Sequence, residues 1–318
     1  MARLKEYNGH YCESEYEYAF IGFLEAEGWK YSSGNNIHRV TKRDILIVDD
    51  FKKFIADTNP DLTEEEVTQI YDNVRLVGAE SDFATLHKVY GWMVNGVQFT
   101  PQDGLPRMIP LIDFDNLDKN IFRVVNQFTV EYTNNGQKEN RRPDVLLFVN
   151  GMPLCVIELK NPADANATIY DAWEQINIRY WRDIPHLLHY CPLACISDGV
   201  KTRLGTVRTP YEHFYAWRRV NDGDAVSTLP FEETETMIKG VYAPERFLEI
   251  FRDYIYFQDS IYDSDEVEIV CRYPQFFAAR LLKQSIINSV VQKSGKGGTY
   301  FGATGCGKTY TMAFLARQ

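Results

Sequence analysis

Three charged residues near the middle of the chain have the side-chain types that metal-dependent hydrolysis needs. Asp144 and Glu158 carry carboxylates, and Lys160 carries an ammonium group. Carboxylate oxygens are preferred ligands of Mg²⁺, which can activate a water molecule against a phosphodiester bond. A nearby ammonium group would polarise or position the attacking water. The spacing therefore predicts a catalytic site in which Asp144 and Glu158 are metal ligands and Lys160 is the third catalytic group.

Two apolar strands must position these groups. The runs 144–149 and 154–158 are short and rich in apolar residues, which is typical of buried strands. Side chains alternate between the two faces of a strand, so Glu158 and Lys160 are expected on one face while Leu159 points into the core.

The turn between these strands decides whether Asp144 joins them. Directly paired residues of an antiparallel hairpin share a face. A regular two-residue loop at Asn150-Gly151 would pair Asp144 with Ile157 and turn the aspartate away from Glu158. We therefore predict a three-residue loop or a β-bulge, because either would bring Asp144 onto the same face as Glu158.

An ordinary structural explanation stands beside the catalytic one. An aspartate before a strand is often only a turn residue, and an exposed Glu-x-Lys is common on strands. The apolar runs around Asp144 and Glu158 favour the catalytic interpretation, because they would bring charged groups to one edge of a core.

A second segment with residues that could bind a ligand lies near the last residue of the sequence. Gly302, Gly305, Gly307, Lys308 and Thr309 fit the pattern G-x4-G-K-[ST]. In such a loop, backbone N–H groups cradle phosphates, the lysine meets the β- and γ-oxygens, and the threonine holds Mg²⁺. The pattern predicts ATP binding.

The flanks of this loop fit the same interpretation. The run 299–301 predicts a strand and 310–317 predicts a helix, which is the context the motif requires. Upstream, Gln275 before a predicted helix over 276–291 resembles the adenine-reading glutamine motif of superfamily 2 helicases. A glutamine at a helix start is also ordinary.

The segment 141–162 resembles the PD-(D/E)xK nuclease motif in the form found in type I restriction subunits. The resemblance covers about residues 10 to 318. The matching residues are Pro143-Asp144, Asn150-Gly151, Pro153-Leu154, Glu158-Leu159-Lys160 and Asn161-Pro162, with Asn126, Phe128 and Val130 upstream and Ser197-Asp198-Gly199 downstream.

The family usually carries a Gln-x3-Tyr motif on the helix after the lysine, associated with DNA contact. This chain has Gln175 and Tyr180, with four intervening residues. On an α-helix these side chains point about 140° apart at 100° per residue. They can face the same way only if the helix bulges. Gln175 is therefore the site candidate, and Tyr180 fits core packing beside Trp181 as well.

Glu17 is a further candidate, because this nuclease fold often places a glutamate on its first helix near the metal. Ser14-x-x-Glu17 also fits a capping box, in which Glu17 only returns a hydrogen bond to the helix start. Both interpretations stay open.

The resemblance implies a fold class and a function. The expected fold is α/β, with a mixed-sheet nuclease core and helices over 1–255, followed by the truncated beginning of a RecA-like motor domain over 256–318. The implied protein is an ATP-dependent type I restriction subunit that uses Mg²⁺ and ATP and cleaves unmodified double-stranded DNA after translocation. Its implied partners are methyltransferase and specificity subunits. Because the sequence stops nine residues after Thr309, we expect an incomplete motor and no ATP hydrolysis by this chain alone.

Two other functions compete with this one. The nuclease-like lobe could be catalytically inactive and serve as a DNA or subunit interaction module of an ATP-driven motor. The chain could also be a stand-alone nuclease, for which the phosphate loop is hard to explain. The complete set of Asp144, Glu158 and Lys160 argues against an inactive lobe.

Periodicity predicts the remaining elements. The expected helices are 15–27, a short one from Asp50, 63–76 with a Thr63-x-x-Glu66 capping box, 82–93, and 168–182. The expected strands are 122–132 and 193–196, with a polar turn at 133–140 and a domain boundary near 251–268.

Composition sets outer limits. The net charge is −10, but the last 50 residues carry seven Lys or Arg and no Asp or Glu, so a basic segment can still meet phosphates. The six cysteines show no CxxC pair, and Cys191-x3-Cys195 has no partner ligands for zinc, which indicates a reduced, cytoplasmic protein. No apolar run reaches the roughly 18 residues of a membrane span.

Overall fold

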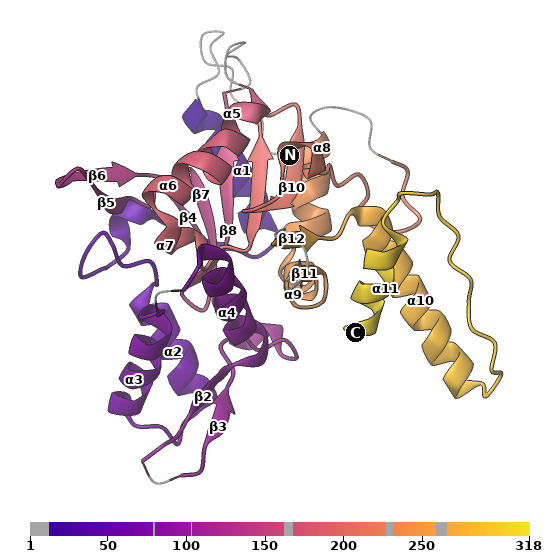
Figure 1. The fold of residues 1–318 in the computed structure, drawn as a ribbon, viewed down its shortest axis with the longest axis horizontal. Helices are drawn as coiled ribbons and strands as arrows, with labels where there is room; N and C mark the ends of the chain where they lie inside the picture. The colour runs from indigo at the N-terminus through magenta and orange to yellow at the C-terminus, as the bar shows by residue number, and fades with distance from the viewer. Residues whose placement is uncertain (1–12, 79, 103, 162–167, 227–231, 259–265) are drawn as a thin grey trace.

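A six-stranded mixed sheet forms the centre of the protein, whose computed structural model describes residues 13–78, 80–102, 104–161, 168–226, 232–258 and 266–318 (Figure 1). Two neighbouring pairs, β1 with β4 and β8 with β9, are parallel, and the other neighbours are antiparallel. The predicted α/β class with a mixed sheet is confirmed. Across the sheet the strands are β1 (Lys30–Ser33), β4 (Phe122–Asn126), β7 (Val145–Val149), β8 (Met152–Leu159), β9 (Leu193–Ser197) and β10 (Thr202–Thr206).

Helices cover both faces of the sheet. On one face, Tyr16 of α1 (Glu13–Ala26) contacts Ser197 on β9, with 2.7 Å between their hydroxyl oxygens. Glu158 pairs with Ile196, the neighbour of Ser197, so Glu158 points to the opposite face. That face is covered by α5 (Ile169–Glu174), the π-helical turn η3 (Gln175–Tyr180) and α6 (Trp181–Asp183) (Figure 1).

This double cover explains the sequence of the central strands. Every residue of β7, β8 and β9 is buried, and a strand buried on both faces must be apolar on both. Two polar residues break this pattern, Glu158 of β8 and Ser197 of β9, each with 0% of the residue exposed, and only Glu158 carries an ionisable carboxyl group.

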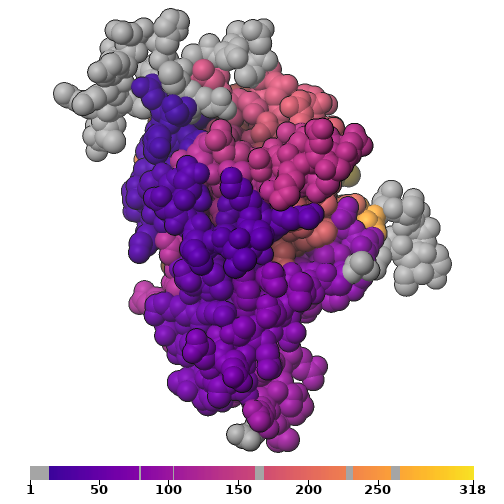
Figure 2. Space-filling view, turned by 90° about the vertical axis from the view of Figure 1, so that its left-hand side faces the viewer, coloured from indigo at the N-terminus to yellow at the C-terminus, as the bar shows by residue number. Residues whose placement is uncertain are grey.

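A helical lobe extends from one end of the sheet and fills the lower part of the face seen in Figure 2. The backbone N–H of Ile47 ties it to the hairpin turn by donating to the carbonyl of Gly151 at 2.8 Å. The predicted helices here are confirmed, including the capping box of Thr63 and Glu66. The lobe contains α2 (Val48–Thr58), α3 (Glu64–Arg75), α4 (Asp82–Asn95), β2 (Val97–Phe99) and β3 (Arg107–Ile109).

The single strand predicted over 122–132 is wrong, because the chain breaks at Gln127. This residue has φ 54°, a left-handed conformation that cannot continue a strand. Beyond it, β5 (Val130–Asn134) and β6 (Gln137–Arg141) form a separate hairpin. The predicted polar turn at 133–140 is therefore mostly strand, and its tight turn is confined to Asn135-Gly136.

The last third of the chain adds helices and one small sheet. The predicted helix over 276–291 is confirmed as part of α10, and the one over 310–317 is confirmed within one or two residues as α11. The segment holds α8 (Glu232–Met237), the π-helical turn η5 (Ile238–Tyr242), α9 (Pro244–Asp253), β11 (Ile255–Gln258), β12 (Val267–Val270), α10 (Tyr273–Val291) and α11 (Lys308–Ala316). The elements not yet named lie earlier in the chain: the helix α7 (Pro185–Leu188) and the 3₁₀ turns η1 (Gly34–Asn36), η2 (Leu117–Lys119) and η4 (Tyr211–His213).

The strand predicted over 299–301 is wrong. These residues are extended without pairing, and Phe301 is 94% exposed. A strand needs a neighbour for its ladder hydrogen bonds, and the described part of the chain places none beside it. Within the residues that the structure describes, the sheet of a RecA-like motor is therefore not seen. The proposed boundary at 255/256 stays a prediction, and residues 259–265 of the expected boundary segment lie outside the described residues.

Within the described ranges, no helix combines the length and the apolarity that crossing a membrane requires.

Candidate active site

A β-bulge sets the register between β7 and β8. Val149 pairs with Met152 around a two-residue turn in which Asn150 and Gly151 have φ of 50° and 78°, as in a type I′ hairpin. Further along, the pairing shifts between Leu147 and Phe148. This confirms the β-bulge that we predicted from the need to bring Asp144 and Glu158 onto one face of the sheet.

The shift decides where the aspartate points. Beyond the bulge Val145 pairs with Ile157, where an unbulged ladder would have given it Val156. Asp144, one residue before Val145, therefore comes opposite Glu158 on the same face of the sheet.

Asp144 and Glu158 form a buried carboxyl pair. Oδ2 of Asp144 accepts a hydrogen bond from the backbone N–H of Leu159 at 2.8 Å. Oε2 of Glu158 is buried and has no hydrogen-bond partner in the described structure. Burial raises the pKa of Asp144, and burial together with the charge of Asp144 raises the pKa of Glu158 well above its usual range. The pair therefore resists carrying two negative charges unless a cation joins it.

Lys160 lies at the end of β8 and faces the pair. Its backbone N–H donates to the carbonyl of Ser197 at 2.8 Å, which fixes the chain at this point. Its ammonium nitrogen donates to Oε1 of Gln175 at 3.0 Å and lies 4.0 Å from Oε2 of Glu158. The structure thus brings Asp144, Glu158, Lys160 and Gln175 together.

Tyr180 joins this group through the π-helical turn. Because a π-helix repeats at i→i+5, it brings Gln175 and Tyr180 onto one side. Nε2 of Gln175 donates to the Tyr180 hydroxyl at 2.9 Å, and that hydroxyl donates to Oε1 of Glu158 at 2.6 Å. The helix bulge that these two residues required is present, and Tyr180 is more than a core residue. The five-residue step from Gln175 to Tyr180 was the feature of the sequence that could have revealed this role of Tyr180.

Glu17 lies on the other side of the strand ends. It is inside α1 together with Ser14, so the capping alternative is wrong. Its carboxylate accepts from Nδ2 of Asn126 at 2.6 Å and from Nε2 of Gln127 at 2.8 Å. The backbone N–H of Gln127 in turn donates to the carbonyl of Asp144 at 3.2 Å. Gln127 was missed in the sequence, because nothing in its spacing marks a break there.

These residues fit a Mg²⁺ ion with a small protein ligand set. Among the described residues, no three acidic, histidine or cysteine side chains cluster so that they could hold a metal. Mg²⁺ is commonly held by one or two carboxylates and keeps several waters. Asp144 and Glu158 supply two, and Oε2 of Glu158, which accepts no hydrogen bond and lies 4.0 Å from the Lys160 ammonium, is the kind of buried oxygen that a metal cation would satisfy. Cys191 and Cys195 are free and buried.

The glycine loop is ordered by its own residues. Gly305 and Gly307 have φ of 79° and 82°, and α11 begins at Lys308. The Lys308 ammonium donates to the carbonyl of Gly302 at 2.8 Å. Nε2 of Gln275 approaches the carbonyl of Gly307 at 3.3 Å, so the structure brings Gln275 and the loop together.

Thr309 is exposed on the first turn of α11, beside the loop. Pro162, which belongs to the nuclease resemblance, lies outside the described residues.

Comparison with known proteins assigns the class of this α/β fold. A family model described as "Type I restriction enzyme R protein N terminus" matches residues 11–213, which is more than half of the chain. The chain belongs to this family of type I restriction enzyme R proteins.

Similarity to known proteins extends over nearly the whole chain. A putative type I restriction enzyme MjaIXP endonuclease subunit of Methanocaldococcus jannaschii is 30% identical over 331 residues, covering 95% of this chain and 31% of the relative. The type I restriction enzyme HindI endonuclease subunit of Haemophilus influenzae is 28% identical over 321 residues, covering 96% of this chain and 30% of the relative. The chain thus spans less than a third of the length of these relatives.

Proposed function

We propose that this chain is the metal-dependent DNA endonuclease part of an ATP-dependent type I restriction subunit. The observation that carries the proposal is the bulged register, which brings Asp144 opposite Glu158 with Lys160 on the same face. The names of its relatives describe endonuclease subunits, in agreement with this role. Its substrate would be unmodified double-stranded DNA.

Asp144 and Glu158 would hold Mg²⁺, which when bound supplies a Lewis acid and an activated water. Lys160 would place its positive charge beside the scissile phosphate, and Gln175 holds that ammonium in position. Tyr180 fixes Glu158 from the other side by donating to one carboxylate oxygen, which leaves Oε2 for the cation.

The glycine loop would bind ATP in the same protein. Gly302, Gly305 and Gly307 allow the backbone to approach phosphates, Lys308 would exchange its loop carbonyls for the β- and γ-oxygens, and Thr309 would meet Mg²⁺. We propose that ATP-driven translocation precedes cleavage and that methyltransferase and specificity subunits supply sequence recognition.

The alternative is an inactive nuclease-like lobe that serves as an interaction module. Oε2 of Glu158, which is buried and accepts no hydrogen bond, favours the catalytic proposal, because a retained but unused carboxyl pair in a core is costly.

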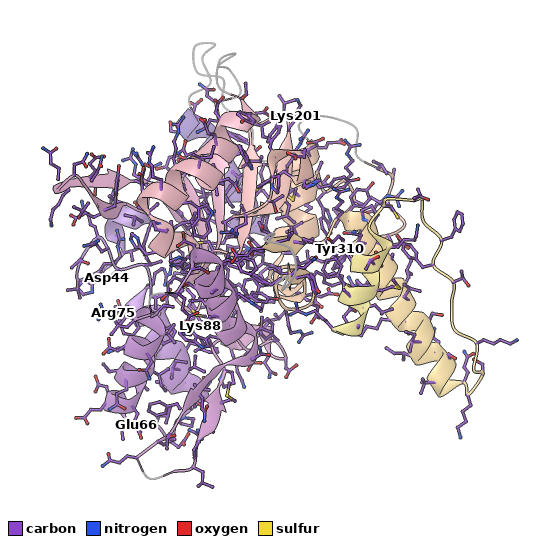
Figure 3. All side chains as sticks on the ribbon, in the orientation of Figure 1. Asp44, Glu66, Arg75, Lys88, Lys201 and Tyr310 are labelled. Carbon is purple, nitrogen blue, oxygen red and sulfur yellow. The ribbon has the colours of Figure 1, made fainter. Side chains whose placement is uncertain are left out.

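Nicking of supercoiled DNA with Mg²⁺ or Mn²⁺ tests the proposal, together with Mn²⁺ binding measured by calorimetry. Lys160→Ala should abolish nicking and keep metal binding, whereas Asp144→Asn should abolish both. The matched control is Lys88→Ala, because Lys88 lies on α4 and pairs with Glu80 at 2.8 Å (Figure 3). An unmodified chain that neither nicks DNA nor binds Mn²⁺ would contradict the proposal.

A further inference from the structure

Asp183, the last residue of α6, holds two arginines side by side. Nε of Arg141 donates to Oδ2 of Asp183 at 2.7 Å, and Nη2 of Arg182 donates to the same oxygen at 2.9 Å. Nε of Arg182 donates to Oδ1 at 2.7 Å. The hydrogen bonds from Arg182 and Arg141 lower the pKa of Asp183, so its carboxylate is ionised. One negative charge balances only one of the two guanidinium groups, and the three groups together keep a positive charge.

Both arginines have donors left for a ligand. The contacts with Asp183 use Nε and Nη2 of each guanidinium group. Within the described ranges, Nη1 of neither Arg141 nor Arg182 has an acceptor. Their side chains are 32% and 64% exposed, so a ligand in solution can reach both of them.

The two arginines line an open groove of about 600 Å³ between the β5–β6 hairpin and the end of α6. Figure 1 shows the hairpin projecting from the sheet beside α6. Arg43 is a third arginine in the lining, which includes the two carboxylates of Glu139 and Asp183. Burial lowers the pKa of His186, another lining residue, to about 4, so this histidine is neutral at pH 7. The positive charges are in excess, and the groove favours an anionic ligand.

The hairpin engages its own carboxylate and helps to hold Arg141. Glu139 accepts from the hydroxyl of Tyr132 at 2.5 Å and from Nδ2 of Asn134 at 2.9 Å. The guanidinium group of Arg141 lies 5.3 Å from the centre of the Tyr132 ring. Arg141 is therefore held by Asp183 and Tyr132 together. Such preorganisation lowers the entropy cost of ordering the side chain when a ligand binds.

Both walls of the groove continue the segments that carry the proposed active site. Arg141 precedes Asp144 by three residues, which span at most about 11 Å of chain. On the other wall, α6 begins directly after Tyr180, whose hydroxyl donates to Glu158. One strand of a DNA duplex carries a phosphate about every 3.4 Å along the axis. A duplex bound at the carboxyl pair would therefore have phosphates within reach of the groove.

We propose that Arg141 and Arg182 together bind one backbone phosphate of the DNA duplex, a few nucleotides from the phosphodiester bond that lies at Asp144 and Glu158. This inference rests on the proposed nuclease function and adds to it a pair of substrate-binding residues. The planar guanidinium group suits this role because its N–H donors match phosphate oxygens. Because one oxygen of Asp183 contacts both guanidinium groups, the pair is expected to share a single phosphate.

Fluorescence anisotropy with a labelled duplex tests the proposal on the 318-residue chain, without divalent metal and over a series of salt concentrations. Combining Arg141→Gln with Arg182→Gln should weaken binding about tenfold or more, the usual contribution of a hydrogen bond to a charged group. The slope of the logarithm of the binding constant against the logarithm of the salt concentration should fall by about 0.9. That is the value for one neutralised phosphate of B-DNA.

Further variants separate contact with DNA from a structural role. Arg182→Gln alone leaves the contact between Arg141 and Asp183, so it should fold and still weaken binding. Arg182→Lys keeps the charge without the planar fork, so it should retain the salt slope while the affinity falls. Arg252→Gln is the matched control and should change neither quantity. Arg252 lies on α9 outside the groove and donates twice to its neighbour Asp253, at 3.0 Å each.

Nicking assays keep this proposal distinct from the nuclease proposal. The pair binds the substrate and does not touch the reacting atoms. The double variant should therefore need about tenfold more DNA for half-maximal nicking, while its maximal rate stays within about twofold of the unmodified chain.

The outcomes separate the two proposals. Unchanged affinity and salt slope in the double variant would overturn the role of the arginine pair, while nicking by the unmodified chain would leave the nuclease proposal standing. A fall in slope about twice as large would overturn the shared phosphate, because two separate phosphates would then be bound. An unmodified chain that binds no duplex would overturn the inference as well. Duplex binding that depends on both arginines, in a chain that neither nicks DNA nor binds Mn²⁺, would support the pair and contradict the nuclease proposal.

Discussion

The hydroxyl of Tyr180 donates to Oε1 of Glu158 at 2.6 Å, and the same hydroxyl accepts from Gln175 at 2.9 Å. Since Gln175 also accepts from Lys160, a chain of hydrogen bonds runs from the ammonium group to the carboxylate. The side chains in this chain of hydrogen bonds are thereby held by one another, which fixes their rotamers before any substrate arrives.

Tyr180→Phe should lower DNA nicking about fivefold and shift its pH dependence, because a lost hydrogen bond of roughly 1 kcal/mol acts on the group that holds the metal. The hydrogen bond from Tyr180 lowers the pKa of Glu158, so its loss raises that pKa further. The ionised carboxylate then forms only at higher pH. We expect the rise of nicking activity to move to higher pH, as measured in a series of buffers.

Tyr190→Phe is the control for this prediction. Tyr190 is also buried, and its hydroxyl donates to the carbonyl of Val74 at 2.6 Å, in the helical lobe. This variant should lose stability and keep the pH profile. Identical profiles for both variants and the unmodified chain would remove Tyr180 from the site.

Gly151→Ala should destabilise the protein more than Gly136→Ala. Both glycines are the second residue of an Asn-Gly turn, with φ of 78° and 79°. A Cβ at Gly136 meets nothing, so that variant should cost only the left-handed strain of about 1–2 kcal/mol. A Cβ at Gly151 would overlap the carbonyl of Ile47 and lie 2.8 Å from the nitrogen of Phe51.

The overlap at Gly151 should add about 1–3 kcal/mol, because α2 must move away from the hairpin. Urea unfolding of both variants measures the difference. Equal midpoints would mean that the hairpin turn and the start of α2 do not pack as the structure has them.

How much of this site the sequence could predict depends on the kind of constraint. The bulge could be predicted because a strand has a fixed period of two, so requiring Asp144 and Glu158 on one face leaves no regular alternative. The spacing of Gln175 and Tyr180 set only a condition, that the helix must bulge for both to face the site, and the π-helical turn meets it. Both are local rules of geometry acting on named residues.

Features that depend on neighbours could not be predicted in this way. The break at Gln127 is a left-handed conformation in a residue other than glycine, and it leaves no pattern in the sequence. The apolar run 299–301 has the composition of a strand, but a strand exists only where another pairs with it.

Glu17→Gln should destabilise the chain by about 1–3 kcal/mol, because the NH₂ group of the new glutamine would face an N–H donor where a carboxylate oxygen now accepts a hydrogen bond. Both oxygens of Glu17 accept N–H groups, one from Asn126 and one from Gln127. Nicking should fall as well, since Gln127 also holds the backbone of Asp144. Glu25→Gln, an exposed change on the same helix, should do neither.

Metal affinity separates two roles for Glu17. A positioning role predicts a Mn²⁺ affinity within about threefold of the unmodified chain, since a change below 1 kcal/mol is expected when no ligand is lost. A much larger loss in calorimetry would instead make Glu17 a metal ligand.

Glu158→Gln should stabilise the metal-free protein, and increasingly so as the pH rises. The pKa of Glu158 is raised in the folded chain above the ordinary value of 4.5, so over the range between these two values the folded state binds more protons than the unfolded state. Stability therefore falls as the pH rises through that range, and glutamine removes this dependence. Glu268 has a raised pKa as well, but it is present in both proteins and cancels in the difference.

Mg²⁺ should reverse the order of stability, so that the unmodified chain becomes more stable than Glu158→Gln. It binds the ionised carboxyl pair and releases protons, so it should raise the Tm of the unmodified chain more at pH 8 than at pH 5. Glu158→Gln lacks one of the two carboxylates and should gain little at either pH. Thermal unfolding followed by circular dichroism measures the Tm of both proteins at pH 5 and pH 8, with and without Mg²⁺. If the variant unfolds at the same temperature as the unmodified chain at pH 8 without metal, then ionisation of the buried carboxyl pair does not destabilise the folded protein, contrary to this prediction.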